Sequence, residues 1–250
     1  MPFNQPALVQ GPYQGIDDSN YSTISVTLGA APANNDFLVA CIVTLGTTVG
    51  TFTTVSSITQ PGVVWTQLLP PVEYFTSTTS RYMVLEVWGG VVGPGAGTLA
   101  TVNLSGFPDN GAVADICEWS NLLTSGFLDQ TGSVNTTGSS TNGPTGITSG
   151  PTSQAVELVC GFNFAINGNP MTVSNPQNRF TQLDGIESNP TGGINFVISY
   201  LVLVTSSQSV YSSGVTINVA SNNIGAIVTL KATPIITAQV YGDGITSYTC

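Results

Sequence analysis

Apolar and polar residues alternate with a period of two along much of this chain, which is the pattern of β-strands with one buried face. The alternation is strict in residues 23–28, so we expect Ile24, Val26 and Leu28 to face a core. Residues 37–43 are apolar at every position, which is typical of a central strand covered on both faces. Both patterns indicate sheets that bury a substantial core.

Other runs of β-branched and aromatic residues lie between clusters of Gly, Pro, Asn and Asp. We predict further strands over 55–59, 63–68, 82–88, 98–104, 112–119, 155–162, 195–205, 215–219 and 224–231. Residues 70–79 and 131–152 are interpreted as loops, and residues 167–178 as a turn-rich segment. About ten to twelve strands at this spacing favour an all-β fold: an antiparallel two-sheet β-sandwich, jelly-roll-like in its connections.

The two ends of the chain differ from this pattern. We interpret residues 1–21, which are rich in Pro, Gln and Gly, as an extended N-terminal arm, residues 22–232 as the sandwich domain, and residues 233–250 as a C-terminal tail. Beyond Pro234 the tail is again competent to form a strand, and its candidate contact residues are Ile235, Ile236, Ala238, Val240 and Tyr241. Such a strand could add to the sheet edge of a neighbouring subunit or complete a sheet of its own domain.

The charge composition narrows the possible functions. The chain has no histidine, three basic residues (Arg81, Arg179 and Lys231) and thirteen carboxylates, giving a net charge of −10. Charged residues are 6% of the sequence, against about a quarter in an average soluble domain. Proton transfer near neutral pH usually employs histidine, and nucleic-acid sites employ arginine and lysine. We therefore predict no enzyme, no nucleic-acid partner, no membrane partner, no metal and no cofactor.

The four cysteines follow no metal-binding spacing. Cys41, Cys117 and Cys160 each lie in an apolar run, which favours small buried hydrophobic residues, and Cys250 ends the sequence. A bridge between Cys117 and Cys160 is the alternative if their strands are neighbours in an oxidising compartment. Residues Met1 to Gln5 lack the basic and apolar segments of a signal peptide, so we expect none.

Eight short segments, taken together in their order along the chain, resemble the strands of a known protein family. They are 35–40, 64–68, 85–88, 97–102, 116–120, 128–131, 156–159 and 226–228. In this order the chain resembles a Gly/Thr/Val-rich β-sandwich family, jelly-roll or lectin-like, of bacterial and archaeal surface proteins and phage structural proteins. The resemblance covers roughly residues 20–232 and rests on order and spacing. It implies a sandwich and a structural setting without a shared set of catalytic residues.

Individual side chains offer few sites. Asp115 and Glu118 flank Cys117 on one predicted strand and should point to opposite faces, so they form no catalytic pair. Glu86 and Glu118 could pair with Arg81 or with a hydroxyl group. Sugars stack on exposed aromatic rings, so Tyr74, Phe75 and Tyr82 are the candidates for contact with a glycan.

These observations predict a structural protein located on a virion surface, such as a capsid decoration or fibre protein. Its partners would be copies of itself or other virion or surface structural proteins. The first alternative is a subunit of a strand-exchange filament, an extracellular appendage of a bacterium or archaeon. The second is a carbohydrate-binding surface module.

Overall fold

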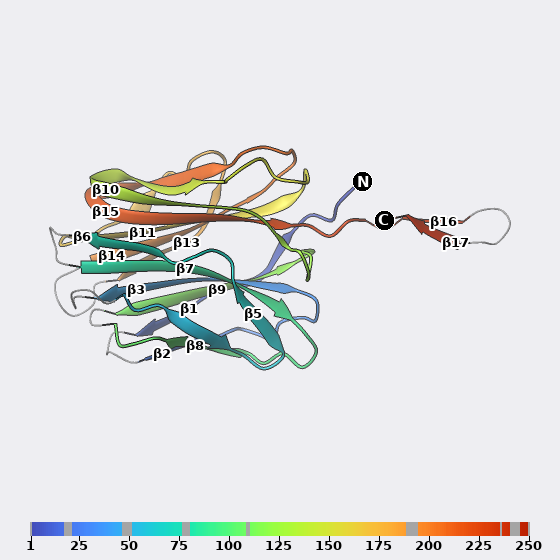
Figure 1. Ribbon diagram of the computed structural model, residues 1–250, viewed down its shortest axis with the longest axis horizontal. Helices are drawn as coiled ribbons and strands as arrows, with labels where there is room; N and C mark the ends of the chain where they lie inside the picture. Colours follow the sequence, from blue (N-terminus) through green and yellow to red (C-terminus); the bar gives the residue numbers. More distant parts are fainter. Residues whose placement is uncertain are drawn as a thin grey trace.

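The computed structural model describes residues 2–17, 22–46, 52–76, 81–108, 111–188, 195–235, 237–240 and 246–249. Within these ranges the chain is all-β, without a helix, and its strands form antiparallel sheets packed face to face (Figure 1). The predicted all-β sandwich is confirmed. The jelly-roll connection stays a prediction.

The first sheet has six strands in the order β1-β9-β3-β7-β5, with β6 also pairing to β7. Its strands are β1 (Ala7–Asp17), β3 (Phe37–Gly46), β5 (Val63–Gln67), β6 (Val72–Thr76), β7 (Arg81–Val92) and β9 (Ala112–Ser120). As predicted, β3 is central and buried on both faces, because the sheet is covered on both sides.

The second sheet also has six strands, in the order β10-β15-β11-β14-β13, with β12 pairing to β15. Its strands are β10 (Leu128–Ile147), β11 (Glu157–Asn167), β12 (Val173–Ser174), β13 (Thr181–Ser188), β14 (Asn195–Val204) and β15 (Ser212–Lys231). The two strands predicted over 215–219 and 224–231 are one continuous strand, β15. Strand β13 was not predicted.

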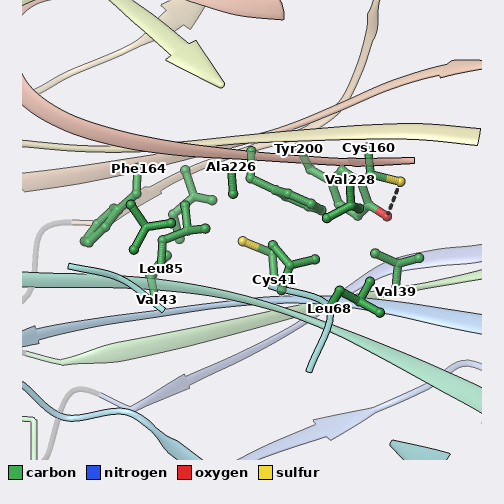
Figure 2. Close-up of a cluster of buried hydrophobic side chains, with 14 of the residues drawn as sticks. Val39, Cys41, Val43, Leu68, Leu85, Cys160, Phe164, Tyr200, Ala226 and Val228 are labelled. Carbon is green, nitrogen blue, oxygen red and sulfur yellow. Dashed lines mark hydrogen bonds between the residues drawn. The ribbon is translucent and has the colours of Figure 1, made fainter. Parts of the chain in front are cut away.

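The main core lies between these two sheets. From the first sheet, Phe37, Val39, Met83 and Leu85 point inward, and from the second sheet Phe162, Phe164 and Tyr200 meet them, all fully buried or nearly so. Figure 2 shows part of this layer, with Val39, Cys41 and Leu85 below and Phe164, Tyr200 and Cys160 above. Burial of apolar area at this interface supplies much of the stabilisation of the fold.

A third sheet, which the two-sheet prediction lacked, covers the other face of the first sheet. It contains β2 (Thr23–Thr27), β8 (Leu99–Leu104) and β4 (Val55–Thr59) in the order β2-β8-β4. Ile24, Val26 and Leu28 pack against Leu38 and Ile116 of the first sheet. The three side chains predicted to face a core are therefore confirmed, and this layer explains why β3 and β9 are apolar on both faces.

The segment predicted as a long polar loop, residues 131–152, instead forms most of β10. Strand β10 pairs with β15 over its length, with register shifts between Thr136 and Asn142. Its second half returns over the outer face of the second sheet, where Asn163 Nδ2 donates to the Pro144 carbonyl at 3.1 Å. With β12 and the start of β15 it covers a smaller outer core that includes Phe180, Val197 and Ile217.

The N-terminal segment is a second correction, because residues 7–17 are β1, an edge strand of the first sheet. Strand β1 pairs with β9 from Ala7↔Ser120 to Asp17↔Ala112, with one register shift between Leu8 and Gln10 and a second, between Gln10 and Tyr13, that accommodates Gly11 and Pro12. Proline is tolerated on an edge strand at such irregularities. A Cβ at Gly15 would lie 2.4 Å from the Ser25 carbonyl oxygen, so glycine allows β1 to pass close to β2. The predicted arm is therefore part of the sandwich.

Candidate functional site

The two ends of the chain meet at one end of the sandwich. Phe3 forms a β-bridge with Pro234, the Ile235 amide donates to the Pro2 carbonyl, and the Asn4 amide donates to the Thr233 carbonyl, both at 2.9 Å. These contacts hold the first residues of the tail against the N-terminus. The tail therefore leaves the sandwich from a fixed point.

Beyond this point the tail forms a hairpin of β16 (Thr237–Val240) and β17 (Thr246–Thr249). The two strands pair with each other from Thr237↔Thr249 to Val240↔Thr246, and in the described ranges they pair with no strand of the sandwich. Figure 1 shows the hairpin projecting beyond the sandwich. Ile235 is exposed, and Ala238 and Val240 lie in β16, whereas Ile236 and Tyr241 lie outside the described residues.

The strands that end each sheet of the sandwich carry its open edges. Strands β1 and β5 end the first sheet, β10 and β13 the second, and β2 and β4 the third. Leu8, Val9 and Ile16 of β1 are large apolar side chains exposed to solvent. An edge strand with exposed apolar residues is a template for pairing with another chain. Sequence reasoning missed this edge because it interpreted residues 1–21 as an arm.

The aromatic residues proposed for glycan contact form a largely internal cluster. The Tyr82 ring packs on Phe75 at 4.6 Å and on Phe52 at 4.9 Å, and only 8% of Tyr82 is exposed. Tyr74 is half-buried against the main core, and Phe75 is 41% exposed. The structure therefore brings Phe75 and Tyr82 together, but only Phe75 offers a broad exposed face. A glycan contact stays a prediction.

The three described cysteines are free and buried in the core, as the favoured interpretation predicted. Cys160 Sγ lies 3.7 Å from the Tyr200 hydroxyl (Figure 2). The same hydroxyl hydrogen-bonds to Cys117 of the first sheet. The alternative bridge between Cys117 and Cys160 is not formed, because each thiol meets the tyrosine instead. Burial raises the pKa of Cys160 to about 12, which keeps its thiol protonated.

Asp115 is the most unusual polar residue of the main core. It is 1% exposed, and neither carboxyl oxygen meets a donor in full hydrogen-bond geometry among the described residues, although the Ile116 backbone lies close enough to lower its pKa slightly. Burial, together with the charge of Asp184, raises the pKa of Asp115 to about 8. A neutral carboxyl group is therefore held between the sheets at neutral pH.

Glu118 points away from Asp115, as the alternation predicted, toward the segment before β3. It accepts hydrogen bonds from the Ala33 amide at 2.7 Å and from the Gln10 side chain. It also hydrogen-bonds to Asp36, whose pKa is raised to about 6 by burial and by this neighbouring carboxylate. Through these hydrogen bonds Glu118 ties β1, β9 and the segment before β3 together.

Glu86 forms a second buried network. It accepts from the Val55 amide at 2.6 Å, from Gln67 Nε2 at 2.7 Å and from Trp88 Nε1 at 3.2 Å. Burial nevertheless raises the pKa of Glu86, because desolvation outweighs these three hydrogen bonds. The partners of Glu86 are amides and an indole, where the sequence suggested an arginine or a hydroxyl. The network joins the first sheet to β4 of the third sheet.

In the described ranges, no three Asp, Glu or Cys side chains gather in a way that could hold a metal ion. The same ranges contain no helix of the length and hydrophobicity required to cross a membrane. No family model, no curated protein and no solved structure matches this chain.

Proposed function

We propose that this chain is a non-enzymatic structural subunit of a virion surface, which assembles when its C-terminal hairpin adds to the open sheet edge of a neighbour. The observation that carries the proposal is the pairing of β16 with β17 alone, outside a sandwich whose own sheets are already built. A hairpin has two edges of its own. Each can donate and accept main-chain hydrogen bonds with a second sheet.

Strand β1 is the proposed acceptor. Its free edge carries the exposed apolar residues Leu8, Val9 and Ile16. Edge strands that must stay monomeric usually carry charged side chains or are covered. Residues 7–16 of β1 carry no charge, so over this part of the strand no charge repels an incoming hairpin.

The sparse charge supports the same role. With 6% charged residues the surface is mostly hydroxyl and amide, which suits a packed shell more than a steered encounter with a charged ligand. The same tail geometry would serve the first alternative, an extracellular filament. A virion and an extracellular filament differ in the shape of the assembled material.

Electron microscopy of the native material, with this chain located in it, tests the proposal. Copies arrayed on a shell or tail support a virion, a helical polymer of this chain alone supports the filament, and an isolated monomer overturns both. A truncation after Ile235 tests the mechanism, because it preserves the contacts of Thr233, Pro234 and Ile235 with the N-terminus. We expect a folded subunit that no longer assembles.

A matched substitution tests the acceptor edge. Val9→Lys places a charge on the exposed edge of β1 and should abolish assembly while leaving the fold intact. Ser206→Lys, at an exposed site between β14 and β15, is the control and should assemble normally. If the truncated chain or Val9→Lys assembles as well as the unaltered chain, the hairpin–β1 mechanism is wrong.

A further inference from the structure

The one lysine of the sequence, Lys231, ends the last strand of the sandwich, and its Nζ lies 3.4 Å from Asp129 Oδ1. Asp129 is on the adjacent strand β10, one residue after Leu128, which pairs with Leu230. The side chains are 26% exposed for Lys231 and 7% for Asp129. This salt bridge is largely shielded from solvent.

A third group completes the cluster on the other side of Lys231. Glu157 begins β11, directly opposite Lys231 in the register of β11 and β15, and it is fully buried. Its carboxyl group hydrogen-bonds to that of Asp129 and to the Thr229 side chain, and its Oε1 accepts from the Gln154 amide at 3.3 Å. A proton on Glu157, donated to Asp129, satisfies both groups.

The two carboxyl groups of this cluster differ in protonation. Burial, together with the neighbouring Asp129 carboxylate, raises the pKa of Glu157 to about 7. Partial burial of Asp129 is outweighed by hydrogen bonds from Ser153 and Glu157 and by the charge of Lys231, so its pKa is lowered. The Lys231 amine thus lies beside Asp129, and Asp129 in turn hydrogen-bonds to the buried acid Glu157.

We propose that Lys231 and Asp129 condense to an intramolecular isopeptide bond, with Glu157 as the acid–base catalyst. A proton passes from the Lys231 ammonium to the Asp129 carboxylate within the ion pair, which leaves a neutral amine and a carboxylic acid. Nζ attacks Asp129 Cγ and forms the C–N bond. Glu157 donates its proton to the departing hydroxyl and takes one from Nζ, so the C–O bond breaks, one water leaves and Glu157 regains its acid form.

The backbone holds both partners in place for this reaction. The Lys231 amide donates to the Phe127 carbonyl at 2.8 Å, and its carbonyl accepts from the Leu123 amide at 2.9 Å. The Ser153 amide donates to Asp129 Oδ2 at 2.5 Å. Reactants held in contact react as if present at effective concentrations of about 10⁵ M or more. Fixed geometry therefore compensates for the low reactivity of a carboxyl group toward an amine.

The position of the bond indicates its use. It would join β10 to β15 two residues before Thr233, where the tail begins to contact the N-terminus. A mechanical force applied to the tail would then be resisted by a covalent bond as well as by the hydrogen bonds of one strand. The bond does not depend on the proposed assembly, so either proposal can fail without the other.

The mass of the intact purified chain tests the bond. We expect a mass lower than that of the unlinked sequence by one water, and a cross-linked peptide that contains Asp129 and Lys231 after proteolysis. The single lysine allows a second measurement: in denaturant an amine-reactive label should modify only the α-amino group. The variants Asp129→Ala and Glu157→Gln should have the full mass of the unlinked sequence and should accept a second label, on Lys231.

Lys231→Arg is the matched control, because it keeps the positive charge beside Asp129 but has no amine able to form the bond. It should fold and show the full mass. The proposal is overturned if the folded unaltered chain has the full mass and takes a label on Lys231. It is equally overturned if Lys231→Arg also lacks one water, because the loss then arises elsewhere, for example at an Asp–Gly sequence.

Discussion

Gly132 lies directly beneath the carbonyl oxygen of Ile147, although both belong to the same strand, β10: a Cβ built at Gly132 would come within 1.8 Å of that oxygen. Two other glycines of the same outer face behave alike. A Cβ at Gly225 would lie 2.1 Å from the Pro144 carbonyl oxygen, and one at Gly161 would lie 2.9 Å from Thr145. Glycines on three neighbouring strands thus make room for the returning half of β10.

We therefore predict that Gly132→Ala destabilises the fold by about 1–3 kcal/mol, the usual cost of inserting a methyl group into a packed site. The returning segment would have to lift, since the obstacle is backbone and not a flexible side chain. Urea unfolding measures the change. Gly168→Ala is the control, because nothing lies within 4 Å of its Cβ position, and equal midpoints for the two variants would contradict the prediction.

The same contact explains why the sequence did not reveal β10. Residues 131–152 are mostly small and polar, so in the sequence they look like a loop. Strands that pass this close to one another need glycine, serine and threonine, and therefore lack the hydrophobic alternation that marks a strand. The half-buried strands were predictable because burial imposes alternation, as at Ile24 and Val26. The two apolar faces of β3 require a layer on each side of the first sheet. Which strands form the third sheet, and in which order, is known only from the pairing of β8 with β2 and β4.

The candidate sites were predictable to a smaller extent. The opposite orientations of Asp115 and Glu118 follow from strand periodicity alone. The meeting of Lys231 with Asp129, and of Asp129 with Glu157, does not follow from periodicity, because it depends on which strands lie beside β15. The only signal in the sequence was the rarity of lysine. A residue used once in 250 positions has a better chance of a specific contact, but its partners come from the topology.

Asp115 should make the fold less stable as the pH rises. Its folded-state pKa of about 8 lies above its ordinary value of 3.8, so the folded form retains a proton that the unfolded chain has lost between these values. Stability is fully present below the ordinary pKa and is lost as the pH rises through the folded pKa. We predict that Asp115→Asn removes this loss, with a gain on the order of a few kcal/mol above pH ~8.

Chemical unfolding of both proteins at a series of pH values measures the effect. Asp36 and Glu157, with pKa values of about 6 and about 7, change stability in the same direction, so the informative quantity is the difference between the two proteins. The two curves should meet in acid and separate toward alkaline pH. Parallel curves would mean that Asp115 is solvated in the folded state.

Glu86 provides a test of the hydrogen-bond networks between sheets. Glu86→Ala leaves the Val55 amide, the Gln67 amide group and the Trp88 indole without their acceptor. Each unsatisfied buried donor costs about 1–3 kcal/mol, although relaxation toward water reduces the sum. We expect a loss of about 2–4 kcal/mol in the free energy of unfolding.

The control for Glu86 is Glu73→Ala, which removes an exposed carboxylate of β6 and should change stability by less than about 0.5 kcal/mol. Urea denaturation of the two variants under one set of conditions gives the comparison. If Glu86→Ala unfolds at the same urea concentration as Glu73→Ala, the three donors find other partners and the network contributes little.

The core thiols should be inert until the sandwich opens. Only a thiolate reacts readily with alkylating reagents, and burial raises the pKa of Cys41, Cys117 and Cys160 above the ordinary value. In a Cys250→Ser background we predict no alkylation of the native chain and three alkylated cysteines in denaturant without reductant. An added exposed thiol, Ser206→Cys, is the positive control and should react at once in the native state. One alkylated cysteine in denaturant, rising to three after reduction, would instead reveal a Cys117–Cys160 bridge and would show that Tyr200 does not keep the two sulfurs apart.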